Sequence, residues 1–170
     1  HWSGLLKILE IQQIRNGKII WEKQNLRNLL HYEGELFILQ AAFTGGQNST
    51  IIPENYYLGL DNRTTLALAD NIGSLSGEPI SNGYARQPVS SSGDFVVARE
   101  NLSSHYSATC PIVIFQASGG SFGPVRNLFL TDKDDNTGKL ISSIALESAL
   151  TVAAGDSVRM RIAMMLKDCA

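Results

Sequence analysis

The N-terminal residues carry the apolar pattern of a strand that turns back on itself. Apolar residues recur between Leu6 and Ile14 at β-strand spacing, and the pattern resumes in Lys18–Gln24. Between the two runs, Asn16-Gly17 supplies residues that adopt positive φ readily, as the type I′ turn of a tight hairpin requires. The chain is therefore predicted to begin with a β-hairpin.

A helical period follows the hairpin. Asn25 is a candidate N-cap, and an apolar stripe runs from there to Phe43, just before the stop signal Gly45-Gly46. The stripe contains Leu26, Leu29, Leu30 and Phe37. Gly34 costs about 1 kcal/mol of helix propensity relative to Ala, so a kink or close packing is expected there. We predict one amphipathic helix of about four turns, lying on the adjacent sheet or on a neighbouring subunit.

From Tyr56 onward, short apolar runs recur about every ten residues between clusters of Gly, Pro, Asn, Asp and Ser, as in β-sandwiches and jelly rolls. The runs predict strands at Tyr56–Leu60, Tyr84–Val89, Phe95–Arg99, Tyr106–Thr109, Ile112–Ala117, Val125–Thr131, Leu140–Leu146 and Val158–Leu166. A short helical turn is expected within Leu66–Leu75. We therefore expect a mainly β protein with two parts. Residues 1–46 form a hairpin plus helix that serves as an attachment arm, packed on the same domain or on a neighbour. Residues 47–170 form a β-sandwich or jelly-roll-like domain.

Composition narrows the function classes. The 170 residues carry a net charge of −2 with a pI near 5.9, and no basic cluster is present, which argues against a nucleic-acid partner. No run approaches the ~18 apolar residues of a membrane span, so no membrane partner is expected. Cys110 and Cys169 are expected to be reduced thiols of a protein assembled in a cytoplasm, in preference to one disulfide. Because the chain begins with His1 rather than Met, we expect it to be processed or part of a longer sequence.

Gly119-Gly120-Ser121-Phe122-Gly123 matches the G-x-S-x-G pattern of a serine nucleophile elbow. That motif needs a following helix, and its His comes later in the chain. Here Pro124 leads into another β run, and no His follows His105. A glycine-rich turn is the better interpretation.

The segment Asp132–Gly138 places oxygen-bearing side chains at alternate positions, as a calcium loop does. An EF-hand requires Gly and Glu where this chain has Thr137 and Ser143, and flanking helices are not predicted. A loop between two strands explains the same residues. An irregular calcium site stays open as the alternative.

The histidines do not suggest a metal site. His1, His31 and His105 are far from one another in sequence and from the cysteines, without zinc-ligand spacing. His31 is expected to be an exposed or interface residue of the helix. Glu33 and Glu35 fall on different helix faces, so no carboxylate pair is expected. No catalytic, cofactor-binding or metal-binding residue is therefore predicted, and no cofactor.

The segment Gly77–Gln87 is the most distinctive in the chain. It predicts turns at Glu78-Pro79 and Asn82-Gly83, followed by a strand that opens on Tyr84. Arg86 is placed to pair with Glu78 across the bend. We interpret this segment as structural.

Several motifs occur in an order that resembles small β-rich virion proteins of tailed bacteriophages. They are Tyr57-Leu58-Gly59-Leu60, Gly77-Glu78-Pro79, Gly83-Tyr84-Ala85-Arg86-Gln87, Gly123-Pro124-Val125, Phe129-Leu130-Thr131-Asp132, Gly138-Lys139-Leu140 and Val152-Ala153-Ala154-Gly155-Asp156. The resemblance implies a non-enzymatic capsid decoration (cement) protein on the outer capsid surface. Its partners would be the major capsid protein and copies of itself, as a dimer or trimer.

Three alternatives stay open. The first is a structural subunit of the tail, collar or fibre. The second is a host-glycan-binding module, for which Tyr56, Tyr57, Tyr106 and Phe122 are the candidate aromatic contacts. The third is a hydrolase of the cell envelope, which the incomplete serine motif does not favour.

Overall fold

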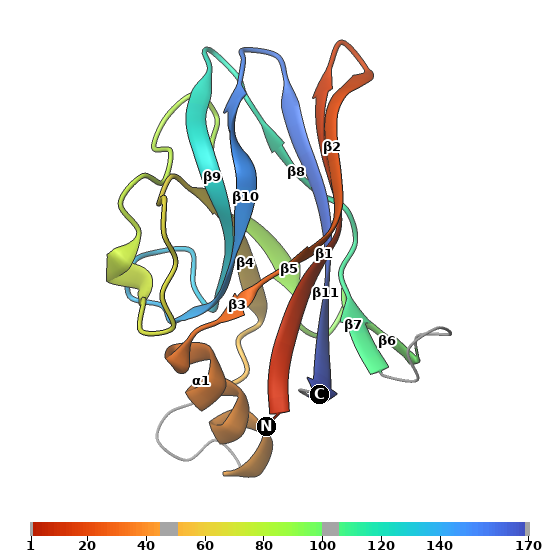
Figure 1. Ribbon diagram of the computed structural model, residues 1–170, viewed down its shortest axis with the longest axis vertical. Coiled ribbons are helices and arrows are strands. Elements are labelled where there is room, and N and C mark those ends of the chain that lie inside the picture. The colour runs from red at the N-terminus through yellow and green to blue at the C-terminus, as the bar shows by residue number, and fades with distance from the viewer. Residues whose placement is uncertain (1, 45–50, 100–105, 169–170) are drawn as a thin grey trace.

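The protein is mainly β. A computed structural model describes residues 2–44, 51–99 and 106–168, and in these ranges the strands form two antiparallel sheets with one α-helix (Figure 1). The mainly β prediction is confirmed, as is the single helix within the described residues.

The first sheet is built around β11. In the described residues its strand order is β2-β1-β11-β7-β6, and β8 also pairs with β11. Its strands are β1 (Trp2–Arg15), β2 (Lys18–Arg27), β6 (Val96–Arg99), β7 (Tyr106–Thr109), β8 (Val113–Gln116) and β11 (Ser157–Asp168). We call it the β11 sheet.

The second sheet has β9 in its middle, with the order β3-β10-β9-β4-β5 over the same ranges. Its strands are β3 (Leu29–Leu30), β4 (Asn55–Asp61), β5 (Gln87–Ser90), β9 (Phe122–Thr131) and β10 (Leu140–Val152). We call it the β9 sheet.

One hydrophobic core joins the two sheets. The β11 sheet contributes Phe115, Val158 and Ile162, and the β9 sheet contributes residues such as Leu58 and Ile144, all at most 1% exposed. Burying each such side chain stabilises the fold by about 1.5–3 kcal/mol. The core therefore lies between the sheets and is the main reason that they stay together.

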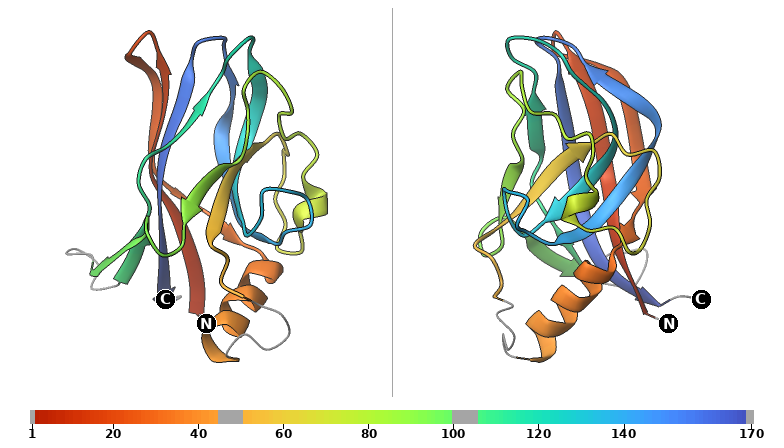
Figure 2. Two further views of the ribbon diagram at one scale, coloured as in Figure 1. Left: turned by 180° about the vertical axis from the view of Figure 1, so that it is seen from behind. Right: turned by 90° about the vertical axis from the view of Figure 1, so that its left-hand side faces the viewer.

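The N-terminal hairpin belongs to the β11 sheet. β1 pairs with β11 from Trp2↔Asp168 to Ile14↔Ser157, and Ile11 on β1 is 0% exposed. The Asn16-Gly17 turn has positive φ at both residues, as the sequence predicts. Because β1 and β11 run antiparallel, both ends of the chain lie together, at the end of the molecule that also carries α1 (Figures 1 and 2).

The helix begins later than predicted. Asn25 has a φ of 57° and stays in β2, where Leu26 pairs with Ile8. Asn tolerates positive φ, so this residue forms an irregularity in the strand and does not cap a helix. After β3, which pairs with β10, α1 spans Tyr32–Phe43. The predicted stop at residues 45–46 lies outside the described residues.

Gly34 lets α1 lie directly on β10. A Cβ atom added at this position would stand 2.1 Å from the carbonyl oxygen of Ile141 and 2.8 Å from its carbonyl carbon. Both are backbone atoms and cannot move aside. The close packing expected at Gly34 is therefore confirmed, and the position needs glycine for reasons of space.

The predicted strands after residue 55 are present, with shifted ends. β10 is longer than predicted, and Phe122 opens β9, so the segment after Ser121 is a strand and not the helix of a nucleophile elbow. The predicted Tyr84–Val89 strand begins only at Gln87. The turn expected in residues 66–75 is a 3-10 helix at Ile72–Ser74.

Candidate functional site

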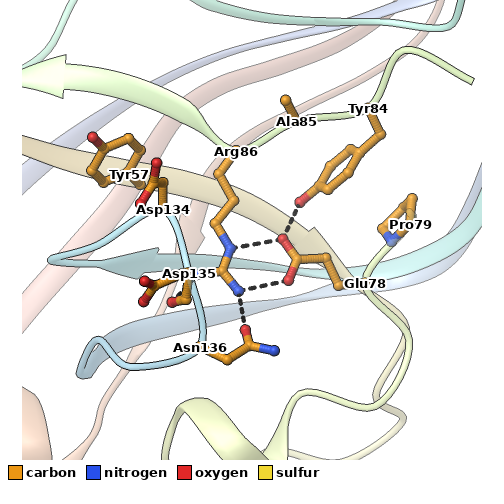
Figure 3. A pocket seen from close by; sticks show the side chains of 9 residues that line it. All are labelled: Tyr57, Glu78, Pro79, Tyr84, Ala85, Arg86, Asp134, Asp135 and Asn136. Atoms are coloured by element: carbon orange, nitrogen blue, oxygen red, sulfur yellow. Dashed lines mark hydrogen bonds and ion pairs between the residues drawn. The ribbon is translucent and has the colours of Figure 1, made fainter. Parts of the chain in front are cut away.

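The two most distinctive segments of the sequence meet in one pocket. It is open, has a volume of about 500 Å³, and lies where the Glu78–Arg86 segment faces the loop between β9 and β10 (Figure 3). Its lining consists of Tyr57, Glu78, Pro79, Tyr84, Ala85, Arg86, Asp134, Asp135 and Asn136. We call it the Arg86 pocket.

Arg86 is the centre of this pocket and is almost fully buried, with 5% of its side chain exposed. Its Nε and Nη2 donate to the two Glu78 oxygens at 2.8 and 2.7 Å, which confirms the predicted pairing. Nη1 donates to the carbonyl oxygens of Lys133 and Asp135, and Nη2 also donates to Asn136 Oδ1. Burial lowers the pKa of Arg86, but the hydrogen bonds and charge of Glu78 raise it by more, so the group stays charged.

These contacts use all five N–H donors that a guanidinium has. The face of the guanidinium is also covered, because its Cζ lies 5.1 Å from the ring centroid of Phe129. No donor remains to bind a phosphate or carboxylate from outside. The polar groups of the Arg86 pocket therefore connect two loops to each other, as expected of a structural site.

Tyr84 explains why the strand starts late. Its hydroxyl accepts a hydrogen bond from the Leu60 amide at 2.8 Å and donates to Glu78 Oε1 at 2.9 Å. Leu60 lies beyond the part of β4 that pairs with β5, so the tyrosine hydroxyl takes the place of a strand partner. Burial, followed by the charge of Glu78, raises the pKa of Tyr84, so the hydroxyl keeps its proton.

The loop that resembles a calcium site is organised by the chain itself. Asp132 Oδ1 accepts the Lys139 amide at 2.6 Å, and Asp135 Oδ1 accepts both N–H and O–H of Thr137. Those hydrogen bonds lower the pKa of Asp135. The loop carbonyls of residues 133 and 135 point at Arg86. Among the described residues, no group of three or more His, Cys, Asp or Glu is arranged to hold a metal ion.

His31 is buried, so the prediction of an exposed or interface residue is wrong. Its ring is 0% exposed, with Nδ1 2.9 Å from the carbonyl oxygen of Ala67 and Nε2 2.8 Å from Ser143 Oγ. The carbonyl can only accept, so Nδ1 carries the proton and Nε2 accepts from Ser143. Ser143 Oγ in turn accepts from Arg63 Nη2 at 3.1 Å.

This Ser143–His31 pair has the spacing of a nucleophile and its base, but it is closed to solvent. Ser143 is also 0% exposed, and its hydroxyl is held by His31 on one side and by Arg63 on the other. Arg63 further pairs with Asp61 and Asp70. A nucleophile needs access to its substrate. The cluster therefore connects β10, the start of α1 and residues 61–70 through buried hydrogen bonds and ion pairs.

The other candidate residues do not come together. The candidate aromatic residues for glycan binding are separated. Tyr56 packs edge-on between Phe37 and Phe95, Tyr57 lines the Arg86 pocket, and Phe122 is 4% exposed and contacts Tyr84. Only Tyr106, on the other sheet, is 66% exposed. They form no shared platform. Glu33 accepts the Leu140 amide, and Glu35 is exposed.

Cys110 is a free, buried thiol whose pKa is raised by burial. Cys169, His1 and His105 lie outside the described residues. Within residues 2–44, 51–99 and 106–168, no helix has the length and apolar character needed to cross a bilayer.

The chain matches no protein-family model, no curated protein and no solved structure.

The feature that sequence reasoning missed is the exposed apolar surface of α1 and β6. On α1, Tyr32, Leu36, Leu39 and Phe43 are 55–81% exposed. On β6, Val96 and Val97 are 66% and 69% exposed. Both elements lie at the end of the molecule that carries the chain termini (Figures 1 and 2). For α1 a signal was present in the sequence, because Tyr32–Phe43 is too apolar for a helix with a single buried face.

Replacing Arg86 with lysine should weaken the hydrogen bonds and the ion pair that connect the two loops. A lysine ammonium cannot bind both Glu78 oxygens and the loop carbonyls together, so we expect the free energy of unfolding to fall by about 2–4 kcal/mol. Urea unfolding measures this change. Arg126→Lys on exposed β9 surface is the matched control and should stay within about 0.5 kcal/mol of the wild type. Equal stability of both variants would contradict the structural role of Arg86.

Stability should depend on pH through His31. Burial lowers the pKa of His31, and the Arg63 charge adds to this, against the opposing hydrogen bond to Ala67. Below about pH 6.5 the unfolded chain binds a proton that the folded chain does not, so stability is lost as pH falls from there toward the folded pKa.

Urea unfolding between about pH 7.5 and about pH 5 measures this loss. The pKa of Asp156 is lowered by Arg15 and that of Asp135 by Thr137. Protonation of these two carboxylates therefore reduces stability only below about pH 4. His31→Gln, compared over the same range, should lose most of the slope. An unchanged slope in that variant would show that another group is responsible.

Proposed function

We propose that this chain is a non-enzymatic structural protein of a tailed-phage virion. More specifically, we propose a capsid decoration (cement) protein that clamps adjacent major capsid protein subunits on the outer surface of the head. The phage assignment rests on the resemblance of the motifs between residues 57 and 156 to small virion proteins. The protein-binding role rests on the edge strand β6.

β6 is the edge strand most open to a partner. All four of its residues are exposed, and in the described part of the chain it pairs on one side only, with β7. Over the described ranges, β8 also pairs on one side only, with β11, but two of its four residues are buried. Three further edge strands are protected in ways that natural sheets use against unwanted pairing. β5 contains Pro88, and β3 is two residues long. The opposite edge of the β11 sheet, β2, carries Lys18, Glu22 and Lys23.

An open edge strand binds another protein by extending its own sheet. The main-chain N–H and C=O groups of β6 supply the affinity, and the exposed valines supply apolar contact. Such binding requires no catalysed reaction. A subunit that attaches only to the assembled capsid stabilises that assembly by mass action. The buried, internally bonded state of Arg86, His31 and Ser143 agrees with a role of this kind.

We also propose that the fold is a β-sandwich of the jelly-roll type. A shared core between two antiparallel sheets agrees with a β-sandwich of the jelly-roll type, an architecture common in capsid proteins. A tail, collar or fibre subunit is the alternative location, since an open edge strand would serve there equally well. The separation of Tyr56, Tyr57, Tyr106 and Phe122 over different packing environments does not favour a glycan-binding module.

Copy number in the purified virion tests the proposal directly. Quantitative mass spectrometry should give a ratio to the major capsid protein near one, or a simple fraction that the icosahedral lattice repeats. A count of roughly three to eighteen copies, set by ring or fibre symmetry, would favour the tail or neck. Absence from the virion would overturn the structural role in both places.

The contribution of β6 can be tested by placing charge on the edge. The double variant Val96→Lys, Val97→Lys should bind purified capsids at least about tenfold more weakly, because lysines on an edge strand block the addition of another strand. Both side chains are exposed, so stability should change by less than about 1 kcal/mol. Ile19→Lys, Ile20→Lys on β2 is the matched control, since these residues are 51% and 47% exposed. Co-sedimentation with capsids measures the affinity, and equal binding by both variants would exclude β6 as the contact.

A further inference from the structure

Helix α1 has two apolar faces, and the described residues of the chain cover one of them. The inner face packs on the β9 sheet through Gly34 and Phe37, which is 3% exposed. The outer face carries Tyr32, Leu36 and Leu39 at 55–56% exposure and Phe43 at 81%. We call these four residues the outer stripe.

The outer stripe has the spacing of a two-helix seam. Its members follow one another at intervals of four, three and four residues. An alternation of three and four is the repeat by which two helices pack along their length. Any helix face has this spacing, and a second helix is an occupant that it fits along its whole length.

The stripe is also symmetric about its own centre. Read in either direction, it is an aromatic residue, two leucines and an aromatic residue at the same intervals. When two copies of α1 lie antiparallel, Leu36 of each copy therefore meets Leu39 of the other, and Tyr32 meets Phe43. A two-fold axis through the middle of the helix satisfies every position of the stripe at once.

Charge selects the antiparallel direction over the parallel one. The acidic residues of α1, Glu33 and Glu35, both lie in its first turn, and its last turn has no basic residue. Glu33 accepts the Leu140 amide of its own chain, but Glu35 is exposed, so parallel helices would bring the two Glu35 carboxylates to the same end. Antiparallel helices place the two acidic ends on opposite sides, where like charges do not repel.

The outer stripe supplies most of the area that a specific contact needs. With about 200 Å² for a complete aromatic side chain and somewhat less for leucine, the exposed fractions leave roughly 450 Å² of apolar surface on each copy. Two copies would bury roughly 900 Å² from the stripe alone, close to the ~1,000 Å² that separates specific interfaces from incidental contacts. The largest apolar patch on a typical monomer is about 300–600 Å² and is often a functional surface.

We infer that the outer stripe of α1 binds a second copy of this chain as an antiparallel, two-fold symmetric helix pair. The pair is built from side chains of α1 and uses no residue of β6. The inference does not depend on the capsid proposal, because the purified chain alone forms the pair. A failed dimer leaves capsid binding by β6 intact, and failed capsid binding leaves the dimer intact.

Sedimentation velocity on the purified chain, from about 1 µM to about 300 µM, is the first test. The wild type should shift from monomer to dimer within this range. Leu36→Lys alone and Leu39→Glu alone should each remain monomeric at every concentration. Both new residues form helices as readily as leucine and replace exposed side chains, so the fold should be kept, as circular dichroism can verify. Ile80→Lys, at a site 95% exposed and away from α1, is the control and should dimerise like the wild type.

Mixing the two monomeric variants tests the direction of the helices. In the antiparallel pair, Lys at position 36 of one chain meets Glu at position 39 of the other, and Leu39 of the first chain meets Leu36 of the second. The mixture should therefore form a heterodimer that salt weakens. Parallel helices would face each new charge with a leucine, so no heterodimer would form.

Each outcome decides the matter. A wild type that stays monomeric overturns the inference, as does a dimer that persists in both single variants. A dimer that both variants abolish but their mixture does not restore overturns the antiparallel arrangement. Restoration by mixing, with a normal dimer from the Ile80→Lys control, supports it.

Discussion

Two buried guanidinium groups hold the irregular segment 62–86 against the β9 sheet. Arg63 ties its first residues to Asp61, Asp70 and Ser143, and Arg86 ties its end to Glu78 and the β9–β10 loop. A segment of this length has few main-chain ladders of its own, so side chains must satisfy the polar groups it buries. Removing either guanidinium would leave a carboxylate buried without its partner, which is among the most destabilising changes a core can suffer. The polar interior is therefore devoted to holding the fold.

This use of polar residues limits what the molecule can do. The groups that resemble catalytic or ligand-binding residues already have partners within the chain. The five N–H donors of Arg86 are bonded within the chain, and the His31–Ser143 pair is closed to solvent. Among the described residues, the exposed groups include the main chain along β6 and the apolar side chains on α1. Groups of these two kinds suit protein binding, which supports the structural role proposed above.

Local signals in the sequence predicted most of the fold. The hairpin turn at Asn16-Gly17, the later strands and the Glu78–Arg86 pair depend on neighbouring residues, and these predictions are confirmed. The errors arose where distant contacts override local preference. Leu29 and Leu30 suit a helix, yet they pair with β10, and His31 is buried because Ser143, more than a hundred residues away, supplies its partner. No periodicity within the segment itself carries that information.

The apolar composition of helix α1 is the sequence feature that points to the proposed helix pair. A helix on the surface of a soluble domain normally has one apolar face, and its polar residues cover the other. The twelve residues of α1 include only two charged side chains, and one of these, Glu33, caps the Leu140 amide of the adjacent strand. Gly34 then fixes which face is turned inward, because only that face can approach the backbone of Ile141. The outward direction of Leu36 and Leu39 is thus imposed by packing on the inner side. These exposed apolar residues are the surface on which the proposed helix pair is built.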